Sequence, residues 1–362
     1  MPNQTNGFVI KAGPRALEII RDEGLRPERV RVVAGAAGGP KWLVLYHLDR
    51  LMLSGFFAAD TAPVDFIGSS IGAWRFAAWC QDDAAAALDR FRDAYIHQRY
   101  EHKPTPAEVT AESRRVMDGY ISDAGIDQIL THPSRRLNIL AVRCRHLTAC
   151  EDKLRMGLGL TAAAGANLIS RDYLKYFFGR CLFGDLQRPL PLGGATALPF
   201  ARYPLDRKNF RDALLASGSI PLVMSGIRSI DGADGGVYRD GGMIDYHLDL
   251  PYRLPPGALV LMPHFATKII PGWLDKPLGW RRPAAANMAQ VVMIAPSPDL
   301  VARLPGAKIP DRTDFKTYFQ KNEARFAAWE AAVSCCRAPS EDLMEAIAGG
   351  RIRDRVQPLD GI

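Results

Sequence analysis

The sequence lacks the features that mark membrane-spanning, secreted or metal-stabilised chains. No apolar run approaches the ~20 residues that a membrane-spanning helix needs. The six cysteines form no C-x-x-C pair, and their scatter fits neither a zinc site nor a disulfide framework. Met1–Lys11 has no basic stretch followed by an apolar core, so no secretory leader is indicated. We therefore expect a protein of the reducing cytoplasm, with no metal and no cofactor.

The sequence also lacks repeats of fixed period and segments biased enough to predict disorder. Hydrophobic residues make up 48% and charged residues 23%, as in ordinary globular proteins. The net charge of +7 comes from scattered Lys and Arg, with only short pairs such as Arg114-Arg115. A nucleic-acid partner is not expected, because such binders gather their basic residues in one stripe. The charge predicts either a solvated basic surface or attraction to anionic lipid headgroups.

Strands and helices alternate over the first 80 residues. Residues 30–34 form a β-branched run, residues 42–52 carry apolar side chains at helical spacing, residues 64–67 form a second strand, and residues 73–80 a second helix. This alternation predicts an α/β fold with a mostly parallel sheet covered by helices. No linker stands out, so one domain over 1–362 is expected. Further strands are predicted at 137–142, 258–262 and 291–295, and further helices within 81–133, within 154–182, at 209–217, and in a C-terminal extension at 315–335 and 341–347 (about 310–350).

A serine sits at the centre of a G-x-S-x-G pattern between the second strand and the second helix. The pattern is Gly68-Ser69-Ser70-Ile71-Gly72, and it predicts a sharp strand-to-helix turn that exposes the Ser70 hydroxyl. The flanking glycines let the chain pass close by without Cβ clashes. The alternative is a glycine-rich turn with a surface serine. The context favours Ser70 as a nucleophile.

A glycine-rich loop, Gly35–Lys41, follows the first predicted strand. It lacks the G-K-[ST] ending of a phosphate-binding P-loop. Backbone amides in such a loop can instead stabilise a developing oxyanion, and Gly38 and Gly39 are the better donors because Pro40 has no N–H. Lys41 adds a cation nearby. A plain turn into a helix is the alternative.

Two Asp-Gly-Gly motifs offer a carboxylate partner for the serine. Asp240 follows a short β-like step and is expected to be anchored, whereas Asp234 lies in a very polar run typical of a solvated loop. The pattern alone does not separate the two. A calcium loop at Asp231 and Asp234 is disfavoured, because the spacing differs from an EF-hand. His264 is the best histidine for a Ser-His-Asp triad, although a surface or capping role is the commoner one.

Together these elements resemble the patatin-like phospholipase family. In that family a glycine-rich oxyanion loop ending in a basic residue precedes a G-x-S-x-G elbow, and a D-G-[GA] motif supplies the catalytic Asp. The matching stretches are Gly38–Lys41, Gly68–Gly72 and Asp240–Gly242, and Ala216–Pro221 is similar to the family's A-S-x-A-x-P stretch. The resemblance covers about residues 30–265.

The sequence departs from the family pattern at several positions. Ala37 replaces the first of three glycines, Trp42 replaces the final one, bulky Trp74-Arg75 follows the elbow, and Asp245–His247 stands where Asn often precedes Pro. These differences bear on the choice of substrate more than on the type of reaction.

The resemblance implies a three-layer fold whose mostly parallel sheet is covered by helices on both faces. It further implies a Ser70–Asp240 dyad that hydrolyses ester bonds of lipids, as a phospholipase A or lysophospholipase does. The oxyanion hole is then expected from Gly38, Gly39 and Ile71, with Lys41, Gly241 and Gly242 in support.

Two other functions remain open at this stage. The same serine could serve an acyltransferase or an acyl-thioesterase, although the elbow lacks a neighbouring histidine. The chain could also be a non-catalytic lipid-binding protein. Peripheral membrane contact is a further expectation, because Ile269–Leu274 and Trp280–Arg282 combine aromatic or apolar residues with basic ones, as headgroup-zone segments do. Ordinary loop packing is the alternative for both segments.

Overall fold

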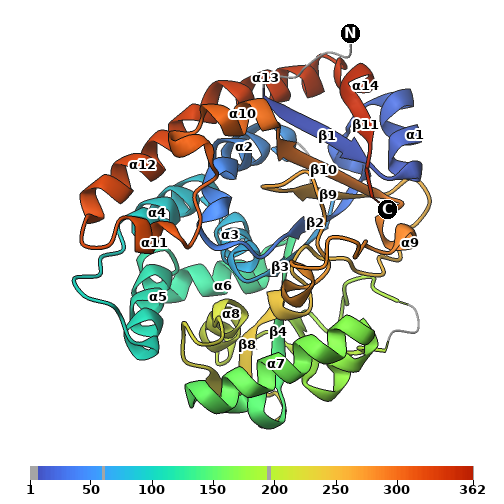
Figure 1. Cartoon of the computed structure of the whole chain (residues 1–362). Helices are drawn as coiled ribbons and strands as arrows, with labels where there is room; N and C mark the ends of the chain where they lie inside the picture. Colours follow the sequence, from blue (N-terminus) through green and yellow to red (C-terminus); the bar gives the residue numbers. More distant parts are fainter. Residues whose placement is uncertain (1–6, 59–61, 194–196, 362) are drawn as a thin grey trace.

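One long mixed β-sheet forms the centre of the molecule in a computed structural model (Figure 1). The structure describes residues 7–58, 62–193 and 197–361, so residues 1–6 of the N-terminal segment considered above lie outside it. The spatial order of the strands is β11-β1-β10-β9-β2-β3-β4-β5-β6, with β8 on β4 and β7 on β8. The strands are β1 (Phe8–Ala12), β2 (Val30–Gly35), β3 (Val64–Ser69), β4 (Arg135–Cys144), β5 (Phe178–Gly184), β6 (Phe200–Pro204), β7 (Ile227–Arg228), β8 (Val237–Asp240), β9 (Leu259–Pro263), β10 (Val291–Pro296) and β11 (Val356–Pro358).

The centre of the sheet is parallel, from β10 through β9, β2 and β3 to β4. Antiparallel pairs flank it, β1 with β10 on one side and β4 with β5 on the other. The predicted α/β class with a mostly parallel sheet is therefore confirmed.

The helices are α1 (Pro14–Glu23), α2 (Tyr46–Leu51), α3 (Ile71–Trp79), α4 (Ala84–Ile96), α5 (Pro106–Tyr120), α6 (Asp123–Thr131), α7 (Lys153–Ile169), α8 (Phe210–Gly218), α9 (Ala285–Met288), α10 (Pro298–Arg303), α11 (Asp314–Thr317), α12 (Asn322–Cys335), α13 (Arg337–Ala348) and α14 (Ile352–Arg355).

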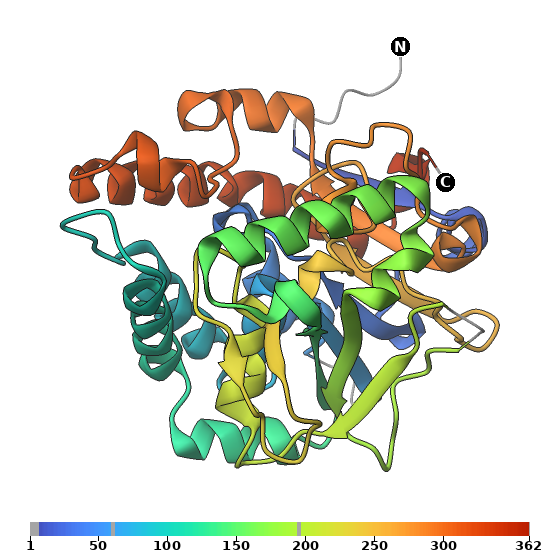
Figure 2. The same ribbon diagram turned by 60° about the horizontal axis from the view of Figure 1, so that its bottom comes forward.

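Helices pack on both faces of the sheet, because successive strand residues point to opposite sides. On β9, Leu259 and Leu261 enter a core that also holds buried residues of α2, α3, α4, α8 and α12. Val260 and Met262 enter a core on the other face, together with Met288 of α9. Next to it, α7 packs on the end of β4 (Figure 2). None of the helices in the described part of the chain is both long and apolar enough to cross a bilayer.

The structure corrects several predicted boundaries. The predicted helix at 42–52 is a 3₁₀ turn (Gly39–Leu45) followed by α2 and a π turn (Met52–Phe56). Trp42 through Leu45 are all fully buried there, so packing on every side decides the backbone rather than a single apolar stripe. The predicted helix at 315–335 is broken into α11 and α12, because Gln320 has a positive φ of 59° that an α-helix does not accommodate.

The helix predicted within 154–182 is α7, and the rest of this stretch holds a 3₁₀ turn (Arg171–Tyr176) and the start of a strand. Phe178–Gly184 is strand β5, paired with both β4 and β6. Its Arg180 guanidinium forms two 2.8 Å hydrogen bonds with the buried Asp245 carboxylate. This long-range pairing fixes a strand that the local sequence does not indicate.

Candidate active site

Ser70 lies at a strained junction between β3 and α3. Its backbone has φ 55° and ψ −127°, in the region that non-glycine residues rarely adopt. The two glycines of the motif permit this turn. A Cβ on Gly72 would lie 2.0 Å from the Gly35 carbonyl oxygen, and one on Gly68 would lie 2.2 Å from the Ala73 nitrogen. The sequence therefore folds here into the elbow that the motif predicts.

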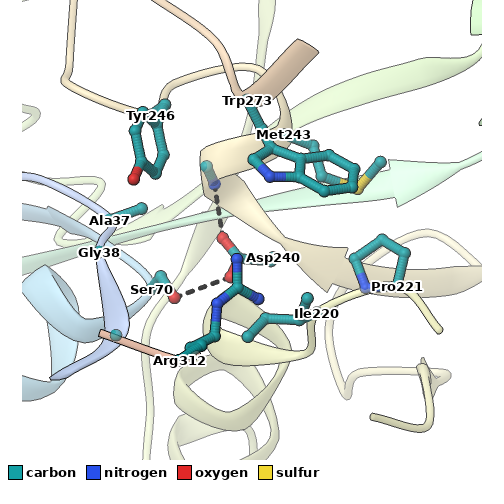
Figure 3. A pocket seen from close by; sticks show the side chains of 12 residues that line it. Ala37, Gly38, Ser70, Ile220, Pro221, Asp240, Met243, Tyr246, Trp273 and Arg312 are labelled. Carbon is teal, nitrogen blue, oxygen red and sulfur yellow. Dashed lines mark hydrogen bonds between the residues drawn. The ribbon is translucent and has the colours of Figure 1, made fainter. Parts of the chain in front are cut away.

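The side chains of Ser70 and Asp240 meet directly (Figure 3). The Ser70 hydroxyl donates to Asp240 Oδ2 at 2.7 Å, and the Gly242 amide donates to Asp240 Oδ1 at 2.7 Å. One carboxylate oxygen thus faces the hydroxyl while the other is fixed by the backbone. Ser70 is 6% and Asp240 8% exposed, so the pair lies in a largely water-free place.

Strand β4 brings the two residues together across 170 positions of sequence. The last residue of β3, Ser69, pairs with Leu140, and Asp240 at the end of β8 pairs with the next residue, Ala141. Strand β3 runs parallel to β4 and strand β8 runs antiparallel to it. The C-terminal ends of β3 and β8 therefore point at one another along one edge of β4.

The end of α8 fixes the backbone on both sides of the pair. The Ser217 hydroxyl accepts from the Ser70 amide at 2.8 Å and donates to the Leu140 carbonyl at 2.6 Å. The Ser219 carbonyl accepts from the Asp240 amide at 3.1 Å. The Ala216–Pro221 stretch singled out in the sequence therefore holds both halves of the site in register.

Burial raises the pKa of the Asp240 carboxyl above its ordinary value. The hydrogen bonds from Ser70 and Gly242 and the positive charges of Arg312 and Lys276 act in the opposite direction. A carboxyl whose pKa is raised in this way is a stronger proton acceptor than one in water.

The glycine-rich loop lies against the same pocket. The Ala37 amide donates to the Tyr246 carbonyl at 2.8 Å, so it is not free to face a substrate. Gly38 and Gly39 line the pocket beside Ser70. A Cβ on Gly38 would lie 2.4 Å from Phe265, so this close packing excludes a side chain there. Gly39 has φ 57°.

The other predicted support residues lie around this centre. Ile71 is the first residue of α3, where an amide has no partner within the helix. Gly241 packs on β4, since a Cβ there would lie 2.4 Å from the Leu140 oxygen. The Lys41 ammonium lies 5.0 Å from the centre of the Phe265 ring, and burial lowers the pKa of this amine.

The remaining pocket walls come from the Ala216–Pro221 stretch and from residues outside the motifs. Apolar groups of Ile220, Pro221, Met243 and Trp273 line one part, and Tyr246 another (Figure 3). Trp273 belongs to the segment that the sequence places at a membrane interface. Trp273 lines the pocket and Ile269 is 3% exposed, so these two side chains follow the alternative of ordinary loop packing, while membrane contact by Ile269–Leu274 stays a prediction.

Arg312 enters the pocket from the C-terminal part of the chain. Its side chain points toward the Ser70–Asp240 pair, and its Cγ lies 3.3 Å from where a Gly39 Cβ would be (Figure 3). The neighbouring acids Asp311 and Asp314 pair with Lys308 instead. In the described chain no carboxylate forms an ion pair with Arg312, so its charge faces the pocket. Lys276 adds a second cation, 4.0 Å from the centre of the Tyr246 ring.

The structure separates the alternatives for the partner of Ser70. Asp234 pairs with Arg143 at 2.6 Å, and its side chain is 57% exposed. His264 is fully buried and its Nδ1 bonds to the backbone of Ala266, outside the pocket. Burial lowers the pKa of His264 to about 3, so the ring is neutral. Within the described ranges, no three His, Cys, Asp or Glu side chains cluster closely enough to hold a metal ion.

Comparison with known proteins adds no assignment to this geometry. No protein-family model matches the chain, and no curated protein matches its sequence. The case for a function therefore depends on the arrangement of the pocket itself.

Sequence reasoning missed Arg312, Met243, Tyr246 and Trp273. The sequence marked Trp273 and Tyr246 for other reasons, and no pattern placed any of the four in the pocket, because each enters it through the packing of loops around the sheet. The role of Ser217 was detectable only through the resemblance of its stretch.

Proposed function

We propose that the chain is a serine acyl hydrolase of the patatin-like kind, cleaving ester bonds of lipids. The observation that carries the proposal is the 2.7 Å hydrogen bond from the Ser70 hydroxyl to Asp240 Oδ2 on a strained elbow. A hydroxyl in contact with a buried carboxylate is the arrangement of an activated nucleophile and its base.

In the proposed reaction, Asp240 accepts the Ser70 proton while Oγ bonds to the ester carbonyl carbon. The tetrahedral intermediate then expels the alcohol, which takes the proton from Asp240. Water attacks the acyl-enzyme in the second half, giving its proton to Asp240 and releasing the acid. The Ser70 oxygen recovers the proton as the acid leaves. No group outside the chain, the ester and water is needed.

The negative charge of the intermediate develops beside the loop of Gly38 and Gly39. Amides of these two residues and of Ile71 are the proposed oxyanion donors. The N-terminal end of α3, nine residues long, adds a favourable dipole.

The lining of the pocket favours an acyl ester that also carries an anionic group. Ile220, Pro221, Met243 and Trp273 offer an apolar surface for an acyl chain. Arg312 and Lys276 place positive charge next to it, and guanidinium groups bind phosphate through paired hydrogen bonds. A phospholipid or lysophospholipid fits both features better than a neutral glyceride.

The first test is covalent labelling by a fluorophosphonate, which reacts with activated serines. We expect labelling to be located on the peptide containing Ser70 by mass spectrometry, and to be absent in Ser70→Ala. A folded protein that takes up no label would support the non-catalytic alternative and contradict the proposal.

Replacing Arg312 tests the anionic part of the substrate. For Arg312→Gln we expect kcat/KM on a lysophospholipid to fall at least about tenfold, since a charge-assisted hydrogen bond contributes on the order of 1.5–3 kcal/mol. Hydrolysis of a monoacylglycerol with the same acyl chain should change much less. Lys316→Gln, an exposed cation four residues away, is the matched control. Equal losses on both substrates would show that Arg312 does not select for the anion.

The same acyl-enzyme could pass its acyl group to another alcohol or arise from a thioester. Product analysis with phospholipid and acyl-CoA in the presence of glycerol separates these cases: free fatty acid from phospholipid is the expected main product. The cytoplasmic location expected from the sequence stays a prediction.

A further inference from the structure

Helix α7 carries an apolar stripe on its outer side. Its inner side is a regular stripe of buried residues, Met156, Gly159, Leu160, Ala163 and Asn167. The opposite stripe should be polar on a water-facing helix. Instead Leu154 is 72%, Leu158 56%, Leu168 55% and Ile169 76% exposed.

The apolar surface continues beyond the ends of α7. Leu147, Tyr173, Tyr176 and Trp280 are 43%, 42%, 57% and 64% exposed, and these are among the largest exposed hydrophobic side chains described. We call these four side chains together with Leu154, Leu158, Leu168 and Ile169 the α7 surface. In the ribbon view α7 runs across the outside of the molecule, with its outer side away from the sheet (Figure 2). Exposed apolar patches of this kind mark interaction sites in proteins.

Buried polar contacts hold the α7 surface in one piece. The fully buried Asp275 carboxylate accepts from Asn167 of α7 at 2.7 Å and pairs with Arg171 at 2.7 Å. Arg281, next to Trp280, also pairs with Asp275 at 3.4 Å and donates to the Asn167 carbonyl at 2.6 Å. The loop with Trp280 is therefore fixed against the end of α7.

Cations are in slight excess around the α7 surface: Arg145, Lys153, Arg155 and Arg282 are exposed, against the exposed acids Glu151, Asp152 and Asp172. The three acids lie just beyond the ends of the stretch from Lys153 to Arg171, which itself has no acidic residue. Lys153 and Arg155 are exposed at the N-terminal end of α7, and Arg282 is exposed beside Trp280. Aromatic and aliphatic groups with cations nearby are suited to the boundary between acyl chains and anionic headgroups.

The inner side of α7 packs against elements of the pocket wall. Met243, which lines the pocket beside Asp240, is buried in the same core as Met156 and Leu160 of α7. The 3₁₀ turn Trp273–Asp275 contributes Trp273 to the pocket and Asp275 to the contacts with α7. A layer bound on the outer side of α7 would thus be separated from one side of the pocket by this helix alone.

We propose that the α7 surface is a docking site for an anionic lipid bilayer, with α7 lying in the plane of the headgroups. The apolar stripe enters the acyl boundary, while Lys153, Arg155 and Arg282 reach the anionic headgroups. The proposal goes beyond the hydrolase function, because docking on a bilayer through α7 does not require Ser70 chemistry.

The test is sedimentation with vesicles, made with the Ser70→Ala chain so that hydrolysis cannot alter the lipid. We expect binding to vesicles of phosphatidylcholine that contain about 30 mol% phosphatidylglycerol, and weaker binding to vesicles of phosphatidylcholine alone. Leu158→Gln combined with Ile169→Gln should lower the affinity at least about tenfold, because two apolar side chains leave the acyl boundary. Both side chains are exposed, so the fold should be unaffected.

Leu186→Gln is the matched control. Leu186 is 47% exposed and lies at the far end of β5 from Tyr173 and Tyr176. The Leu186→Gln variant should bind vesicles as tightly as the Ser70→Ala chain from which it is made. Lys153→Gln combined with Arg155→Gln should lower binding to anionic vesicles by about fivefold per cation and leave binding to phosphatidylcholine alone nearly unchanged.

Three results would overturn the proposal. One is absence of vesicle binding by the Ser70→Ala chain, and another is equal binding by the Leu158→Gln/Ile169→Gln variant. The third is a dimer in analytical ultracentrifugation that this variant disrupts without any vesicle binding, which would make a second copy of the chain the occupant. A failure of the hydrolase function would leave the vesicle result unchanged, so the two proposals fail separately.

Discussion

Ser70→Ala is expected to lower kcat/KM for p-nitrophenyl acyl esters by at least about 10⁴-fold. The loss follows from the proposed mechanism, because the hydroxyl that contacts Asp240 at 2.7 Å is the proposed nucleophile. The residual rate would come from binding and the oxyanion donors alone. Initial rates with an active-site titration check the result.

Ser69→Ala is the matched control for this variant. Ser69 is adjacent in sequence and fully buried, but its hydroxyl has no hydrogen-bond partner within the described structure. Removing it should cost little activity. If Ser69→Ala loses as much as Ser70→Ala while both stay folded, the elbow has been assigned to the wrong residue.

Asp240→Asn is expected to lower the same rate by about 10⁴-fold while keeping the geometry of the site. The amide oxygen can still accept from the Gly242 amide, but the side chain can no longer accept the proton of Ser70. Asp234→Asn, in the other Asp-Gly-Gly motif, should keep full activity because Asp234 pairs with Arg143 in solvent.

The Asp240→Asn variant is also expected to be more stable at neutral pH. Burial sets the pKa of Asp240 in the folded chain above that in the unfolded chain, so the ionised carboxylate costs folding free energy at pH 7. The cost vanishes as the pH falls below the unfolded value, near about 4, because both states are then protonated. The free energy of unfolding should rise by about 1 kcal/mol at pH 7, and the gain should shrink toward pH 4.

Thermal unfolding at pH 7 and pH 4 measures both parts of this prediction. Lower stability of Asp240→Asn at pH 7 would mean that the ionised carboxylate stabilises the fold rather than being held there at a cost. If Asp240→Asn loses activity without becoming more stable, Asp240 can still be the base, but its buried carboxylate does not lower the free energy of unfolding at pH 7.

The elbow and the order of the first strands were predictable because they depend on local sequence. The G-x-S-x-G spacing permits a backbone that side chains on Gly68 or Gly72 would block. The β-branched run at the start of β2 forms a strand wherever it is buried on both faces. The two Asp-Gly-Gly motifs, in contrast, share one pattern, and the residues around them favour Asp240 without separating it from Asp234.

Elements fixed by distant contacts were not predictable in the same way. β5 is a strand because β4 and β6 lie on either side of it, and the break between α11 and α12 depends on a single residue in a left-handed conformation. Arg312 lies in a part of the chain with no recognised motif. Its arrival beside Gly39 follows from how the C-terminal segment packs over the pocket.

The sequence by itself determined the α/β class, the turn at Ser70 and a short list of acidic partners, because these depend on spacing and side-chain type. The tertiary structure alone decided which carboxylate meets the serine. Consecutive residues of β4, Leu140 and Ala141, pair with the ends of β3 and β8 and thereby place Asp240, not Asp234, against the hydroxyl. Register between strands is a long-range property, and no local pattern encodes it.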